Sequence, residues 1–137
     1  MPKVVFFKEV SFMNFDHAHI YCSNLESVIT FLTEALGGKL KTRRLSGGKP
    51  GAEVVFDNLT IFIKESGTDF MPPDLSASVC GYNHLAFVVD DMHQTLATLC
   101  ARPDTRLVVE PYMPGKRLCA FIAGPDNLYV ELIEETP

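Results

Sequence analysis

The sequence predicts an α+β fold made of two βαβββ modules, and three observations support this prediction. The segment DHAHI at Asp16–Ile20 returns as NHLAF at Asn83–Phe87, and DNLTIF at Asp57–Phe62 returns as DNLYVE at Asp126–Glu131. In each half, one run with helical spacing follows a first strand-like segment and precedes three more. Turn residues separate these segments. A duplicated chain with a histidine at the start of each copy indicates two related halves.

The first module follows an N-terminal arm at 1–13 and begins with a strand over Phe15–Cys22. Ser23 and Asn24 then offer a helix N-cap, because their side-chain oxygens accept hydrogen bonds from the first turn. Apolar residues recur at helical spacing from Leu25 to Leu36, and a glycine pair follows, which ends a helix where positive φ is needed. Three further strands are predicted over 39–45, 52–56 and 59–65, with a turn at 46–51 and a tight hairpin at 57–58.

The second module repeats this order of elements. A strand is predicted over Asn83–Val89, Asp90 and Asp91 offer the helix cap, and Pro103 stops the helix that follows. The remaining strands are predicted over 106–112, 116–122 and 128–134, with a turn at 124–127. We therefore expect residues 1–137 to form one domain, in which modules 14–65 and 82–135 are joined by a proline-containing linker at 66–81.

Alternation along the last strand of each module separates two faces. One face is aliphatic and is expected to pack beneath the helix; it carries Leu59, Ile61 and Ile63 or Leu128, Val130 and Leu132. The other face is mixed, as a cavity wall would be; it carries Thr60, Phe62 and Lys64 or Tyr129, Glu131 and Ile133. Approximate twofold symmetry between the halves would place four equivalent positions around one centre: His17, Phe62, His84 and Glu131.

Composition narrows the classes of function. The net charge of −5 argues against nucleic acid or an anionic membrane as a partner, because such surfaces attract dense Lys and Arg. No apolar run approaches the roughly 20 residues that span a bilayer, and Met1–Glu9 lacks the features of a signal peptide. The 4 cysteines show no CxxC spacing and are expected to be reduced thiols of a cytoplasmic protein.

The order of these motifs resembles the vicinal oxygen chelate superfamily, which includes glyoxalase I, methylmalonyl-CoA epimerase, extradiol dioxygenases and the bleomycin and fosfomycin resistance proteins. The segments that carry the resemblance lie between residues 14 and 135: Asp16–Ile20, Phe31–Gly37, Asn83–Asp91 and Gly124–Leu132. It implies paired βαβββ modules that form an open, mostly antiparallel barrel around a divalent metal and a ligand cavity. It also implies a homodimer, with the barrel formed within one chain or by exchange of modules between two.

Carried over residue by residue, the metal positions of the superfamily fall on His17, Phe62, His84 and Glu131. Phe62 is the departure, because glyoxalase I has a glutamate there, the epimerase has a glutamine, and a phenylalanine cannot coordinate. The ligands that remain are His17, His84 and Glu131, a set that suits Fe, Ni, Co, Mn or Zn. Glu131 is also the candidate catalytic base.

Several further side chains are candidates for the site. His19 lies two residues from His17, so it shares that face of the strand; it is a candidate proton shuttle or a polar wall of the pocket. Tyr129 shares the Glu131 face and either binds a substrate oxygen or packs. Phe62 and Lys64 are candidate substrate-binding residues, with Lys64 facing an anion or solvent. Four basic residues either bind a carboxylate or the phosphates of a thioester carrier or lie at solvated strand edges, which is the favoured reading: Arg43, Arg44, Lys116 and Arg117. Solvent positions are expected for His93, Glu134 and Glu135.

Three functions stay open. The first is a metal-dependent lyase or isomerase resembling glyoxalase I or the epimerase, in which the metal polarises a small oxygen-chelating carbonyl substrate and supports enolisation. The second is an Fe(II) extradiol-type dioxygenase with a site of two histidines and one carboxylate. The third is a binding protein that sequesters a small molecule such as an antibiotic, without chemistry. The intact set of three ligands favours an enzyme over the third.

Overall fold

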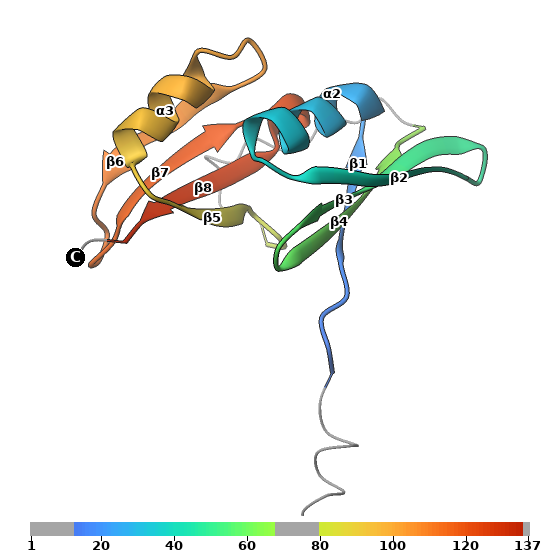
Figure 1. Ribbon diagram of the computed structural model, residues 1–137, viewed down its shortest axis with the longest axis horizontal. Helices are drawn as coiled ribbons and strands as arrows, with labels where there is room; N and C mark the ends of the chain where they lie inside the picture. Colours follow the sequence, from blue (N-terminus) through green and yellow to red (C-terminus); the bar gives the residue numbers. More distant parts are fainter. Residues whose placement is uncertain (1–12, 68–79, 136–137) are drawn as a thin grey trace, which may run out of the picture.

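The strands of the computed structural model, which describes residues 13–67 and 80–135, form two four-stranded sheets, one from each half of the sequence (Figure 1). The strand orders are β1-β4-β3-β2 and β5-β8-β7-β6, so the second sheet repeats the first. In each sheet the first strand pairs in parallel with the last, and the other pairs are antiparallel. The predicted α+β class and the two βαβββ modules are therefore confirmed. Within the described residues no ladder joins the sheets, so they form an open arrangement rather than a closed barrel.

The elements lie close to their predicted positions. In the first module they are β1 (Ala18–Cys22), α2 (Leu25–Thr30), η1 (Phe31–Ala35), β2 (Lys39–Ser46), β3 (Lys49–Phe56) and β4 (Leu59–Glu65). In the second module they are β5 (Leu85–Val89), α3 (Met92–Cys100), β6 (Arg106–Tyr112), β7 (Leu118–Ala123), η2 (Pro125–Asn127) and β8 (Tyr129–Glu134). Most of the linker, at 68–79, lies outside the described residues, as does most of the N-terminal arm.

The first helix departs from its predicted shape in its second half. The sequence spacing predicts one α-helix from Leu25 to Leu36, but Phe31–Ala35 winds as a π-helix, in which the Leu36 N–H donates to the carbonyl of Phe31 at 3.1 Å. The Thr33 hydroxyl also donates to the carbonyl of Ile29 at 2.7 Å. A threonine hydroxyl that bonds the carbonyl four residues earlier competes with the backbone N–H groups for that carbonyl. Such competition accompanies the wider, π-helical turn here. Gly37 then ends the helix at φ +84, as its position predicts.

The same carboxylate contact begins each helix. Asn24 and Asp91 act as the N-caps, since their side chains accept from the N–H groups of Ser27 and Gln94. In addition, the last residue of each final strand accepts from the first helical N–H: Glu65 from Leu25 at 2.9 Å and Glu134 from Met92 at 2.6 Å. The solvent position expected for Glu134 is therefore wrong, because this carboxylate is partly buried against the helix start, where it satisfies an orphan donor.

We expect Glu65→Ala and Glu134→Ala each to lower the free energy of unfolding by about 1–2 kcal/mol, because each leaves a helix-start N–H without its carboxylate. Urea denaturation measures the loss. Glu110→Ala is the matched control, since Glu110 is exposed and surface changes stay within about 0.5 kcal/mol. A loss for Glu110→Ala as large as that for Glu134→Ala would contradict the capping role.

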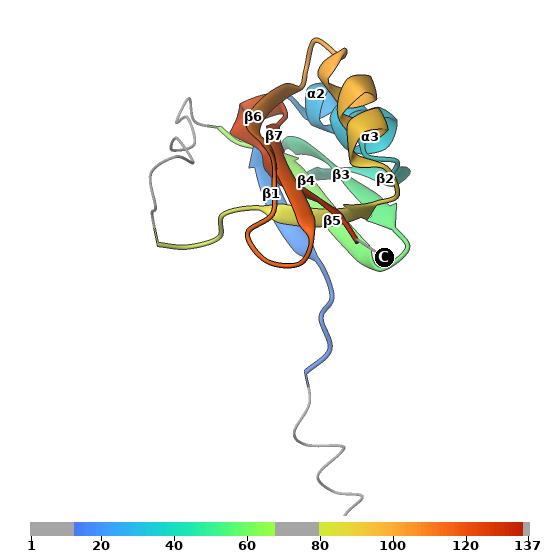
Figure 2. The ribbon, with the colours of Figure 1, turned by 90° about the vertical axis from the view of Figure 1, so that its left-hand side faces the viewer.

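The helices and the two sheets share a single hydrophobic core. In Figures 1 and 2, α2 and α3 lie on the same side of the two sheets. The aliphatic face of each final strand packs under its helix as predicted, with Ile61, Ile63, Val130 and Leu132 at most 2% exposed. One cluster joins these residues to the helix positions Val28, Phe31, Leu32, Met92 and Leu99. The core therefore extends across both modules.

Contacts between the modules fix their relative position. The Phe31 ring is fully buried and lies against Gly124, where an added Cβ would come within 2.6 Å of the ring. The Asp126 carboxylate accepts hydrogen bonds from the N–H of Ser23 at 2.8 Å and from its hydroxyl at 2.6 Å. The turn before β8 is thus bound to the start of α2, and the second module covers a ring that belongs to the first.

Thiol reactivity should follow burial. Burial, with the Asp126 and Glu65 carboxylates nearby, raises the pKa of Cys22 to about 11, and burial also raises the pKa of Cys119. Since the thiolate is the reactive form, these buried thiols react slowly at pH 8. Cys80 and Cys100 are exposed. We expect a disulfide reagent to titrate 2 thiols rapidly in the native protein and all 4 after unfolding. Rapid titration of all four in the native state would contradict this assignment.

Candidate functional site

The predicted ligands of the second module meet at the edge of its sheet. His84 immediately precedes β5, and Glu131 lies in the adjacent strand β8, opposite Ala86. Nε2 of His84 is 3.0 Å from Oε1 of Glu131, and Nδ1 of His84 is 2.7 Å from Oδ1 of Asn83. Both ring nitrogens are therefore engaged. The ring also meets the rings of Phe121 and Tyr129 edge-on, at centroid distances of 5.0 and 6.1 Å.

The geometry of this pair fits two neighbouring ligands of one metal ion. Bonds of about 2.0–2.2 Å from a metal to imidazole nitrogen and carboxylate oxygen, at right angles, place the two ligand atoms about 3 Å apart. The observed separation between Nε2 of His84 and Oε1 of Glu131 is 3.0 Å. The Oδ1 of Asn83 accepts a hydrogen bond from Nδ1–H of His84, so Nε2 of the same ring directs its lone pair toward the Glu131 carboxylate. Two electron-rich atoms this close require a cation or a shared proton between them.

The predicted ligand of the first module has the same local support. Nδ1 of His17 is 2.6 Å from Oδ2 of Asp16, so in each module the residue before the histidine holds Nδ1. The His17 ring stacks on Phe62 with 3.9 Å between centroids and 14° between planes. The side chain of His17 is 32% exposed and that of His84 is 29% exposed. In both histidines the contact to Nδ1 fixes the ring, and the side chain stays partly exposed, so that Nε2 is available to a ligand.

The single chain brings together two of the three predicted ligands. Within residues 13–67 and 80–135, no group of three His, Cys, Asp or Glu side chains lies close enough to hold a metal ion. His17 contacts Phe62 in the first module, whereas His84 contacts Glu131 in the second. The pairing of equivalent positions within each module follows the repeat, but the two pairs do not converge.

The other candidates divide between the two sheets. Tyr129 is 8% exposed and stacks on Phe121 with 5.0 Å between centroids, so it forms one wall beside His84. His19 pairs in register with Phe62 and lies 4.9 Å from the Tyr21 ring. Burial lowers the pKa of His19, and the positive charges of His17, Lys64 and Arg44 lower it further. His19 and Lys64 therefore share one electropositive surface with His17.

Several residues of the site carried no signal in the sequence. Cys119 lies beside Glu131, whose carboxylate adds to burial in raising the pKa of the thiol. Arg44 lies over the Phe62 ring with Cζ 4.6 Å from the centroid, and it pairs with Glu53 at 3.1 Å. Arg44 was expected in solvent, and it is exposed, but its guanidinium also reaches the candidate site. The role of Asp16 and Asn83 is visible in the repeat, since each precedes its histidine.

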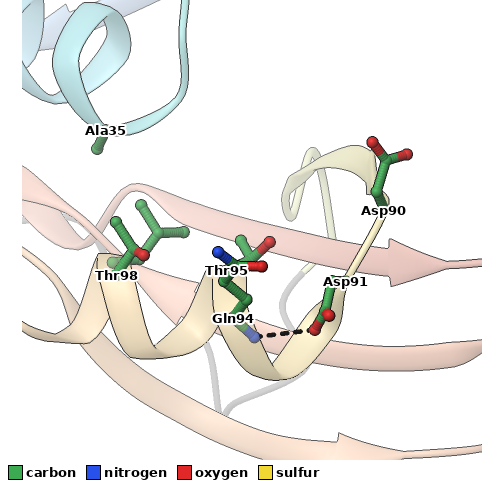
Figure 3. Close-up of a pocket in the computed structure, with 7 residues that line it drawn as sticks. Ala35, Asp90, Asp91, Gln94, Thr95 and Thr98 are labelled. Carbon is green, nitrogen blue, oxygen red and sulfur yellow. Dashed lines mark hydrogen bonds between the residues drawn. The ribbon is translucent and has the colours of Figure 1, made fainter.

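Other hollows lie apart from these residues. A pocket of about 320 Å³ is lined by Ala35 of η1 and by residues at the start of α3 and along it (Figure 3): Asp90, Asp91, Gln94, Thr95, Thr98 and Leu99. The Asp91 carboxylate in it is bound to the backbone of Gln94 as the helix cap. A second hollow of about 490 Å³ lies at the Phe56–Phe87 contact between the modules. Neither contains a predicted ligand. No helix in the described ranges has the length and apolar character needed to cross a membrane.

Comparison with solved structures identifies the fold. A glyoxalase family protein from Bacillus cereus superposes with a TM-score of 0.76 at 20% identity, over 94% of this chain and 98% of that one. This chain has the vicinal oxygen chelate fold. Fosfomycin resistance protein FosX from Listeria monocytogenes, in complex with Mn(II) and sulfate, has a TM-score of 0.67 at 15% identity over 91% and 94% of the two chains. Glyoxalase I from Zea mays, as a V278E mutant, has a TM-score of 0.77 at 23% identity, over 99% of this chain and 50% of that one.

The vicinal oxygen chelate fold was implied by the sequence resemblance, and the structural matches confirm it. Sequence comparison alone finds no match among protein-family models or curated proteins. The structural neighbours differ in their described activities, so the fold leaves the reaction to be argued from the residues. In this vicinal oxygen chelate fold, those residues are the His84–Glu131 pair and the His17–Phe62 pair.

Proposed function

We propose that the protein is a metal-dependent enzyme that enolises a small carbonyl substrate with adjacent oxygen atoms, as glyoxalase-type lyases and isomerases do. His17, His84 and Glu131 would hold the divalent ion. The observation that carries the proposal is the His84–Glu131 pair, whose 3.0 Å separation fits two ligands of one ion and whose imidazole is fixed by Asn83. When bound, the metal would polarise the substrate carbonyl.

The side chains around the ion supply the remaining functions. Glu131 is 17% exposed in its side chain and is the carboxylate of the proposed ligand set, so it would serve as the base that removes the proton. His19 faces the same side of its strand as His17 and relays the proton to or from solvent. Tyr129 lies beside His84 and orients a substrate oxygen. Phe62 covers one side of His17 and excludes water from it.

A second copy of the chain completes the site in this proposal. His84 and Glu131 lie on the second sheet, His17 lies on the first, and the described part of one chain holds no group of three ligands. Exchange of modules in a twofold-symmetric homodimer would bring the His17 of one protomer to the His84–Glu131 pair of its partner, and would form two equivalent centres. The ligand set and the charge of −5 are also consistent with a cytoplasmic enzyme of small molecules.

A dioxygenase of the extradiol type is the second candidate, and the position of Phe62 favours it. Phe62 stacks on His17 where a fourth ligand would stand, so two histidines and one carboxylate remain. This set, with open positions, is the one that non-haem Fe(II) oxygenases use. Iron in the purified protein and oxygen uptake with a catechol would favour this reaction, whereas Ni, Co or Zn would favour the lyase.

Elemental analysis of protein purified without chelator tests the metal proposal. We expect one divalent ion per chain, and we expect His84→Ala and Glu131→Gln to weaken metal binding about 100-fold or more, since each removes a ligand. His93→Ala and Glu110→Gln are matched controls, because both residues are exposed and lie outside the site. Protein that contains no metal and binds none of Fe, Mn, Ni, Co or Zn on addition would contradict the proposal and leave a binding protein without chemistry.

A further inference from the structure

The open face of the first sheet carries a small cationic pocket. A cavity of about 130 Å³ is lined by His19, Arg44, Ser46, Gly51, Ala52, Phe62, Ile63 and Lys64. Three strands bring the charges together, because Gly51 in β3 lies in register with Arg44 of β2 on one side and Lys64 of β4 on the other. Since residue 51 is a glycine, no side chain separates the two cationic residues.

Positive charge in this pocket is not balanced from within it. No carboxylate is among the lining residues of the cavity. Glu53 lies on the next register pair and binds the guanidinium of Arg44 at 3.1 Å, but it also binds Nζ of Lys41 at 3.5 Å. Lys64 is half-buried and forms no ion pair within the described ranges. Cationic groups gathered in a concave site attract anions, and here they do so in a protein of net charge −5.

The pocket adjoins the proposed metal site through one aromatic ring. Phe62 stacks on His17 at 3.9 Å and also lies under the guanidinium of Arg44 at 4.6 Å. The same ring therefore links the pocket to the histidine that would hold the metal. A volume of 130 Å³ is on the order of four water molecules, so the pocket admits one small group and not a whole cofactor.

We propose that this pocket binds an anionic oxygen group of the substrate: a phosphate, a phosphonate or a carboxylate. Lys64 supplies a point charge, Arg44 supplies N–H donors that it holds in a fixed plane against Phe62, and the Ser46 hydroxyl donates a further hydrogen bond. The inference rests on the proposed function in one respect: it takes the substrate to be a small carbonyl compound that also carries an acidic group. Binding of the anion itself needs no metal.

The test measures binding of three probes to the metal-free, full-length protein at low ionic strength: inorganic phosphate, methylphosphonate and acetate. Calorimetry, with phosphorus NMR for the first two, gives the dissociation constants. We expect Lys64→Gln and Arg44→Gln each to weaken binding about tenfold or more, and Lys64→Arg to retain it. Lys39→Gln and Arg117→Gln are charge-matched controls on exposed positions, and we expect no change in either. Thermal melting shows that each variant is folded.

The outcomes separate the head groups and the two proposals. Saturation by phosphate or methylphosphonate alone assigns a phosphoryl or phosphonyl group, and saturation by acetate assigns a carboxylate. No saturation by any probe, or equal weakening in the Lys39→Gln and Arg117→Gln controls, overturns the inference. His84→Ala protein, which lacks a proposed metal ligand, must bind the anion as wild type does. If the protein binds the anion but no metal, the pocket assignment holds and the proposed reaction fails. If it binds metal but no anion, the pocket assignment fails and the proposed metal site holds.

Discussion

We expect metal binding to return when His17→Ala protein is mixed with Glu131→Gln protein, although each variant alone should bind metal weakly. In a module-exchanged dimer, each centre takes His17 from one protomer and Glu131 from the other. A mixed dimer therefore has one centre with both substitutions and one centre with neither. Random exchange of subunits makes half of the dimers mixed, so about a quarter of all centres recover full affinity. Metal titration after mixing and subunit exchange in mild urea measures that fraction.

A second mixture is the control for this experiment. His84→Ala and Glu131→Gln alter ligands that the structure places together, 3.0 Å apart on one sheet. Every centre of a mixed dimer then carries one of the two substitutions, and no recovery is expected. Recovery in neither mixture, with both variants dimeric and exchanging, would show that His17 acts within its own chain or outside the metal site altogether.

Phe31→Ala should have the largest effect on stability, a loss of about 3–5 kcal/mol in the free energy of unfolding. The ring is fully buried, and its cavity lies where the two modules meet, so the surroundings collapse little. Such a loss is a large share of the 5–15 kcal/mol that stabilises a typical domain. Urea denaturation measures it. Phe15→Ala is the matched control, since Phe15 is 74% exposed and its loss should stay within about 0.5 kcal/mol.

Gly124 provides the reciprocal experiment on the same contact. An alanine there places Cβ 2.6 Å from the Phe31 ring, so Gly124→Ala alone should cost about 1–3 kcal/mol through overpacking. Combined with Phe31→Leu, which vacates part of the ring volume, the substitution should cost less than the sum of the two single changes. Strict additivity would mean that the ring and the glycine do not constrain each other.

The sequence predicted two strands with their observed bounds. The bounds predicted for β4 and β6 agree with the structure, and the aliphatic face of β4 is the buried one. The strand predicted over Phe15–Cys22 begins later, at Ala18; Phe15 and Asp16 are exposed and make no strand pairing. The π-helical turn at Phe31–Ala35 escaped prediction, since the apolar spacing there is the same as in an α-helix.

The sequence predicted which residues belong to the candidate site, but not how they are arranged in space. The repeat predicted that His17, Phe62, His84 and Glu131 are equivalent positions around one centre, and the structure pairs His84 with Glu131 and His17 with Phe62. The repeat carries no information on how the two halves face each other, so the separation of the two pairs emerged from the tertiary structure. Arg44 was considered as an anion-binding residue, but the sequence could not decide between that role and solvent, because all of β2 is exposed and shows no alternation that would assign its faces.

The contact between Phe31 and Gly124 also bears on the history of the duplication. In each half, a glutamate at the end of the last strand accepts a hydrogen bond from the first N–H of the helix, as expected of copies with a common origin. The aromatic ring, however, belongs to one copy and the glycine that receives it to the other. The halves have thus ceased to be interchangeable at this contact, because the position of the first half that is equivalent to Gly124 is Val55.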